Sequence, residues 1–272
     1  MAISIDACTS DAIILKMLTI ILLILLGWVV GAFINYISDV MPIRRRLVAP
    51  FCQACDSRIP LLNYFLWPRR CLSCDTLRTR RVWVVEIGIL LATIWLWTNP
   101  ASRLGFIPGL MVLAYFSIVA VIDLEHRLIL HPISLVGVIL GIFIGVWLHG
   151  WLSTLIGGLV GFGIMLALFS IGVVFVRTII RKRRPEFDEE PLGFGDVILS
   201  GILGLFVGWP GIVLCLIVGI LIAGLGALIY ILGRMVTHHY QSFDFVPYGP
   251  FLLAGAFILL FLRDHLVALA SP

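Results

Sequence analysis

Charged residues are scarce in this sequence of 272 residues: they make up 12% of the chain, whereas hydrophobic residues make up 61%. A soluble globular domain carries roughly twice that charged fraction, so the composition excludes an ordinary soluble domain. The sequence also has no Gly-rich phosphate loop, no serine-protease constellation, no convincing internal repeat and no low-complexity segment. Phosphate-loop nucleotide binding and serine-protease chemistry are therefore without support, and no nucleic-acid partner is expected.

Long apolar runs fill most of the chain, which has room for about eight spans of roughly 20 residues. We predict an all-α polytopic membrane protein with about eight transmembrane helices. A short sixth span can cross if it tilts or if the bilayer thins around it. The predicted spans cover about 13–33, 82–97, 104–122, 128–148, 152–176, 196–208, a run that ends near Gly233, and 247–262.

The positive charges gather on one set of loops. With the N-terminus outside, 16 of the 19 Lys and Arg residues fall in cytosolic segments, and nine of them are arginines of segment 38–81. This bias predicts the orientation and places Asp123 and Asp196 at the cytosolic side. The first apolar run is longer than the apolar part of a signal peptide, so it should be retained. We divide the chain into a first transmembrane helix (1–37), a cytosolic insert (38–81) and a seven-helix membrane domain (82–272).

Four of the six cysteines form two CxxC pairs, Cys52 with Cys55 and Cys71 with Cys74. The pairs are 15 residues apart and lie in a segment expected in the cytosol, which favours a zinc site over disulfides. Four thiolates leave no open coordination position, so the metal should be structural. The alternative is four reduced cysteines without a ligand. We predict a small zinc-ribbon-like insert.

Two aspartates lie at the ends of predicted spans: Asp123 ends the third, and Asp196 begins the sixth behind Gly193 and Gly195. Two carboxylates held close share one proton, so one can activate water while the other polarises a peptide carbonyl. The glycines would permit a strained turn and let a substrate backbone pass. Alternatively, each acid is a solvated residue at a helix end. Glu86, inside the second span, is either functional or reaches the interface.

The stretch 193–196, Gly-Phe-Gly-Asp, resembles the GxGD motif of intramembrane aspartyl proteases. The whole chain resembles the type IV prepilin peptidase family, whose first catalytic stretch is matched by Ile122 and Asp123. Segments 31–35, 85–87 and 246–251 match three further family motifs in the same order along the chain.

The resemblance implies a membrane aspartyl endopeptidase of the bacterial inner (plasma) membrane that removes the basic leader of prepilins or pseudopilins at the cytosolic face. Many members then methylate the new N-terminus with S-adenosylmethionine. Asp123 and Asp196 would be catalytic, Gly193 and Gly195 would belong to the active-site loop, and the metal ligands would be Cys52, Cys55, Cys71 and Cys74. The expected partners are the substrate, which the acidic stretch 186–190 could meet, and membrane lipid. Retention of methylation, the particular substrate and the oligomeric state stay open.

Two other classes compete with this interpretation. A membrane transporter could use the aspartates to carry ions or protons, although transporter acids usually lie near the middle of the membrane. A catalytically silent, zinc-stapled assembly factor for pili or secretion could use the insert as a docking module.

Overall fold

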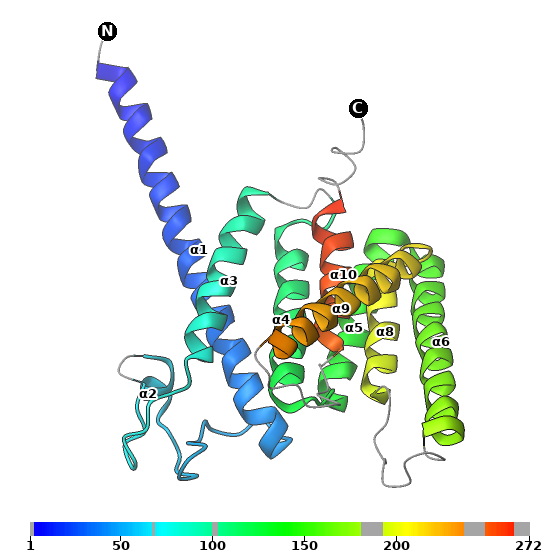
Figure 1. Cartoon of the computed structure of the whole chain (residues 1–272). Helices are drawn as coiled ribbons and strands as arrows, with labels where there is room; N and C mark the ends of the chain where they lie inside the picture. The colour runs from blue at the N-terminus through cyan, green and yellow to red at the C-terminus, as the bar shows by residue number, and fades with distance from the viewer. Residues whose placement is uncertain (1–2, 67–68, 100–102, 181–192, 237–247, 264–272) are drawn as a thin grey trace. The chain divides into compact units, whose positions relative to one another are not determined.

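The computed structural model describes residues 3–66, 69–99, 103–180, 193–236 and 248–263 (Figure 1). These residues form helices and isolated bridges but no strand, which confirms the all-α class. The acidic stretch 186–190 and the first two residues of motif 246–251 lie outside the described residues. The elements are α1 (Ile3–Arg44), α2 (Leu61–Phe65), α3 (Arg81–Thr98), α4 (Phe106–His126), α5 (His131–His149), α6 (Trp151–Phe175), η1 (Val176–Ile180), α8 (Phe194–Val207), α9 (Gly211–Val236) and α10 (Gly249–Phe261).

Six of these helices are long and apolar enough to cross a membrane: α1 from Ile14 onward, α3, α4, α5, α6 and α9. Two shorter apolar helices, α8 with 14 residues and α10 with 13 residues, accompany them. The chain is therefore a multi-pass membrane protein, and the eight predicted apolar segments each correspond to a helix. Their outward side chains are largely Leu, Ile, Val and Phe, as contact with lipid requires.

The chain divides into two compact units, and the first covers residues 1–100. α1 has 42 residues, about 63 Å at 1.5 Å per residue, so it extends well beyond a hydrocarbon core of about 30 Å. It runs seven residues past the predicted boundary at 37, with Pro42 in its last turns. α3 packs on α1 so closely that a Cβ on Gly31 would lie 3.0 Å from Glu86 Cα. This packing places α3 with α1 and the insert, whereas the sequence-based division grouped it with the later helices.

The second unit, residues 101–272, is organised around α8. Most residues of α8 are buried, and α5, α6, α9 and α10 all contact it. Gly150 has a φ of 79° and turns the chain from α5 into α6, a conformation that residues with a Cβ adopt only under strain. The turn leaves α6 alongside α5 and α8.

Glycines hold α6 and α8 at close range, because small residues let membrane helices approach each other closely. A Cβ on Gly157 would collide with the carbonyl oxygen of Gly204 and come within 2.8 Å of Gly208 Cα. Ser200 Oγ donates a hydrogen bond to the carbonyl oxygen of Gly161 at 3.1 Å. Because the obstructing atoms are backbone, neither helix can accept a side chain here without moving.

We expect Gly157→Ala to destabilise the protein by about 1–3 kcal/mol, the usual cost of overpacking a tight interface. Gly163→Ala is the matched control. Gly163 lies on the same helix as Gly157, and a Cβ there would meet no atom within 4 Å. The measurement is thermal unfolding of both purified variants in one detergent. Equal stability of the two variants would contradict the close packing.

Candidate active site and metal centre

α4 carries Asp123 on its buried face. Val112, Phe116, Val119 and Asp123 are all buried and are spaced three or four residues apart, which places them on one stripe of the helix. Asp123 is 6% exposed. Its Oδ2 atom is buried and makes no hydrogen bond with the described residues. A buried carboxylate oxygen without a partner is costly, so this acid is held in place by the fold and not by solvent.

Asp196 lies in the first turn of α8, where its main-chain N–H donates to the carbonyl oxygen of Gly193 at 3.0 Å. It is 9% exposed. The expected strained turn is wrong: Gly193 is extended, with φ −71° and ψ 135°, and Gly195 lies inside the helix. Gly195 provides space instead, since a Cβ there would lie 3.0 Å from the side chain of Ile129.

The two acids come to the same side of the second unit. α4 and α8 run in opposite directions (Figure 1) and touch through Phe116 and Phe206, whose ring centroids are 5.8 Å apart. Asp123 lies about 10 Å from that contact along α4, and Asp196 lies about 15 Å from it along α8. The charge of Asp123 acts on Asp196. The structure thus brings two buried carboxyl groups within electrostatic reach of each other.

The start of α10 adds two residues to this site. A Cβ on Gly249 would lie 2.5 Å from Asp123 Oδ2 and 3.1 Å from its Cγ, so the main chain of Gly249 lies directly against the carboxylate. The preceding Tyr248 is the N-cap residue of α10 and lies within electrostatic reach of Asp196. Its phenol can donate a hydrogen bond. Sequence reasoning used both residues only as part of motif 246–251.

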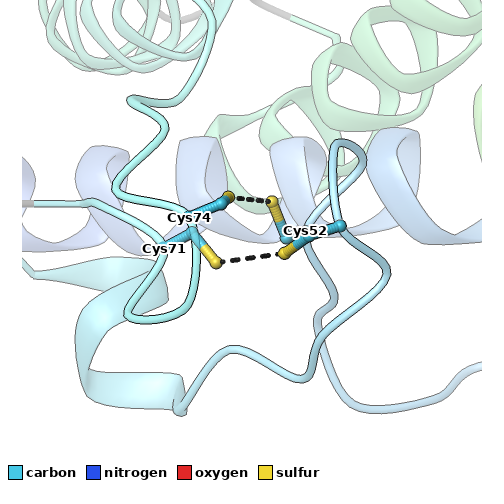
Figure 2. Close-up of side chains that lie close together, drawn as sticks. Cys52, Cys71 and Cys74 are labelled. Carbon is cyan, nitrogen blue, oxygen red and sulfur yellow. Dashed lines mark hydrogen bonds between the residues drawn. The ribbon is translucent and has the colours of Figure 1, made fainter.

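The four cysteines come from two loops of the same form, and Figure 2 shows the sulfur atoms of Cys52, Cys71 and Cys74 turned toward one another. Asp56 N–H donates to the Cys52 carbonyl, and Asp75 N–H donates to the Cys71 carbonyl, each at 2.9 Å. Both aspartates have a left-handed backbone conformation, with φ of 56° and 52°, and Asp tolerates this conformation better than most residues. Cys-x-x-Cys-Asp followed by Ser or Thr occurs twice, a short repeat that the sequence analysis missed.

The geometry of the sulfur atoms fits zinc. All four lie within 4.8 Å of one another, with 3.6 Å between Cys52 and Cys74 and 3.5 Å between Cys55 and Cys71. Ligands about 2.3 Å from a tetrahedral zinc ion are about 3.8 Å apart. Hydrogen bonds, chiefly to Ser57, lower the pKa of Cys71 to about 5, whereas burial raises the pKa of Cys52 to about 11. A bound metal would hold both as thiolates. Such a set can hold a closed, structural metal ion.

A half-buried polar cluster ties the insert to α1 and α3. Asp39 of α1 accepts hydrogen bonds from Tyr64 and Arg78, both at 2.5 Å, and from Arg81. The Arg78 guanidinium also lies 3.8 Å from the centre of the Tyr64 ring. The predicted insert boundary ran through this region, and sequence reasoning assigned Asp39 no role. The cluster explains why α1 stays helical past residue 37.

Glu86 is buried and paired. Its carboxylate pairs with Arg69 at 2.9 Å, and both side chains are 7% exposed. This pair connects the loop after α2 with α3, so the role of Glu86 in the described structure is to anchor the insert.

Taken together, the fold and these two sites define a polytopic α-helical membrane protein with a buried pair of acids and a separate four-cysteine module. Comparison with known proteins makes the class specific. A profile described as Type IV leader peptidase family matches residues 110–232, which contain both acids. A second profile, Bacterial Peptidase A24 N-terminal domain, matches residues 25–99, which contain all four cysteines. The chain belongs to the type IV prepilin leader peptidase family and is therefore a membrane peptidase.

Similar proteins carry the name prepilin leader peptidase/N-methyltransferase. One from Aeromonas hydrophila is 25% identical over 76% of this chain and 67% of its own length. Another from Stutzerimonas stutzeri is 25% identical over 90% and 91% of the two chains, and one from Pseudomonas aeruginosa is 26% identical over 89% and 90%. No solved structure matches the chain.

Proposed function

We propose that this chain is an aspartyl endopeptidase that removes the leader of type IV prepilins or pseudopilins, with Asp123 and Asp196 as its catalytic pair. The observation that carries the proposal is the pair of buried acids on α4 and α8, inside the segment that matches the leader peptidase family. The relatives are named for this cleavage. The distribution of Lys and Arg supports an inner-membrane protein with its N-terminus outside and the acids at the cytosolic face.

The chemistry requires the two acids to hold one proton between them. The ionised carboxylate takes a proton from a water molecule, whose oxygen attacks the carbonyl carbon of the leader bond. The protonated carboxyl group donates to the carbonyl oxygen, on which negative charge develops. Tyr248 is a further donor within electrostatic reach of Asp196. Both acids stand at helix ends on one side of the unit, which suits a peptide entering from the membrane edge and disfavours ion transport.

Zinc would be held by Cys52, Cys55, Cys71 and Cys74, where it would staple the insert and supply no reacting group. S-adenosylmethionine, the methyl donor that N-methylation needs, carries both an ammonium and a carboxylate. A cavity of about 320 Å³ lies beside the cysteines and has Asp39 as its one acidic residue. Asp39 already accepts from Tyr64, Arg78 and Arg81, so the cavity does not fit the ammonium, and we assign no residue to methylation.

The function is tested by adding the purified full chain to a purified prepilin in detergent and reading the N-terminus of the product by mass spectrometry. The expected product lacks the basic leader, and its mass shows at once whether a methyl group has been added. An intact prepilin, or a cut at another bond, would overturn the proposed function.

Gly249→Ala should slow leader cleavage about 10- to 100-fold. The new Cβ would displace the Asp123 carboxylate, the movable partner in that contact, and a shift of about 1 Å at a reacting group can cost a factor of that size. Initial rates at several substrate concentrations should show a lower kcat with an unchanged KM. The control is Gly224→Ala in α9, where a Cβ meets no atom within 4 Å. Normal cleavage by the Gly249 variant would show that Asp123 is not held there.

A further inference from the structure

Arg69 is a buried cation, and one nitrogen of its guanidinium makes no hydrogen bond with the described residues. Its Nη2 atom pairs with Glu86 at 2.9 Å and donates to the Phe65 carbonyl at 3.0 Å, and its Nε atom donates to the same carbonyl at 3.2 Å. The residue is 6% exposed, and Nη1 is buried without a hydrogen-bond partner among the described residues. Leaving such a donor unsatisfied is costly. A group outside the described residues is therefore expected to accept from it.

Arg69 lines a cavity of about 380 Å³, which is within the size range of ligand sites. The Arg69 guanidinium forms part of its wall and lies 4.7 Å from the centre of the Trp83 ring. Glu86 is its one acidic residue, and every other lining group is apolar or aromatic: Trp28, Phe65, Leu66, Trp83, Ile87 and Leu90. A ligand that fits must be amphipathic, with an acceptor at one end and a long apolar part.

The position of the cavity indicates where such a ligand comes from. Five of its lining residues belong to α1 and α3, which are both long and apolar enough to cross a membrane, and the other three come from α2 and the loop after it. Trp83 and Ile87 are 43% and 54% exposed and stand on the first turns of α3, directly after the arginine-rich insert. Aromatic residues next to arginines at the end of a membrane helix mark the level of the lipid headgroups. The ligand is therefore expected to come from the surrounding bilayer.

We propose that this cavity binds one membrane phospholipid. A phosphate oxygen accepts a hydrogen bond from the Arg69 guanidinium, and an acyl chain lies along Trp28, Ile87 and Leu90. Glu86 already balances the charge of the guanidinium, so the phosphate is held by directed hydrogen bonding and not by net attraction. The bound lipid would fill the space between α1, α3 and the loop after α2, and so fix the insert on its two membrane helices.

The test fills the cavity without touching the ion pair. Leu90→Trp places a large side chain inside it, and Leu91→Trp is the matched control, since Leu91 is 59% exposed and does not line the cavity. The full chains are purified, stripped of lipid and titrated with phosphatidylglycerol under native mass spectrometry. The wild type and Leu91→Trp should retain a lipid that Leu90→Trp loses. Diacylglycerol, which lacks the phosphate, and glycerol 3-phosphate, which lacks the chains, should each fail to bind.

Several outcomes would overturn the site. Equal retention of phosphatidylglycerol by the two tryptophan variants would show that the lipid lies elsewhere, and equal loss would show that lipid binding does not depend on the cavity that Leu90 lines. Binding of diacylglycerol as tight as that of phosphatidylglycerol would remove the role of Arg69. Binding of glycerol 3-phosphate alone would make this a site for a free phosphate ester and not for a lipid.

Discussion

Replacing Asp196 by Asn should lower the rate of leader cleavage by about 10²–10⁴-fold, the range that a positioned acid or base supplies. Asn keeps the size of the side chain and its place in the first turn of α8, but it can neither take a proton from water nor share one with Asp123. Asp123→Asn should have the same effect, because the two groups act as one unit. For the same reason, the double variant should be no slower than either single variant.

The measurement is co-expression of each variant with a prepilin, followed by the ratio of mature protein to precursor. Glu125→Gln is the matched control, because Glu125 lies two residues beyond Asp123 on the same helix and its side chain is 34% exposed. It should process the prepilin normally. Equal amounts of folded protein, checked by thermal unfolding, separate lost chemistry from lost folding. Retained cleavage in either Asn variant would exclude the acid pair.

The helices and the two acids could be predicted from the sequence because the bilayer constrains both so strongly. A chain in lipid must satisfy its own backbone hydrogen bonds, so each long apolar run becomes a helix. Loops rich in arginine identify one face, and acids at helix ends on that face are few. These patterns put Asp123 and Asp196 on one face, and the resemblance to the prepilin peptidase family paired them. The structure places both in buried positions within electrostatic reach.

The rest depends on contacts that a local pattern does not encode. A membrane helix is apolar on every side, so its periodicity does not show which face is buried, and the closeness of Gly249 to Asp123 follows only from the packing of α10. The end of α1 was misplaced because Asp39 is held by Arg78 and Arg81, about forty residues later in the chain. The strained turn at Gly193 was inferred from residue type alone, and the backbone there is ordinary.

Loss of the metal should unfold the insert. Cys71→Ser is expected to abolish zinc binding and to open residues 45–80 to proteolysis, because the module has only a small core of its own beside its contacts with α1 and α3. Its buried cluster consists of Cys52, Ile59, Tyr64 and Cys71, supported by Tyr36 and Phe65. Two of the four buried members are themselves metal ligands. A structural zinc site contributes about 10–16 kcal/mol, far more than so small a cluster can supply.

The matched control is Ser73→Ala. Ser73 is exposed and lies between two of the cysteine ligands, and its side chain is not needed for metal binding. Metal content by atomic emission and limited proteolysis should separate the two variants, and a chelator should reproduce the effect of Cys71→Ser in the wild type. A purified wild type without zinc would remove the metal site. Four thiolates leave no position for water on the metal, so a metal with a purely structural role takes no part in cleavage. After partial chelation, the enzyme that is still folded should therefore keep the same pH profile of cleavage. A shifted profile after partial chelation would instead place the metal among the reacting groups.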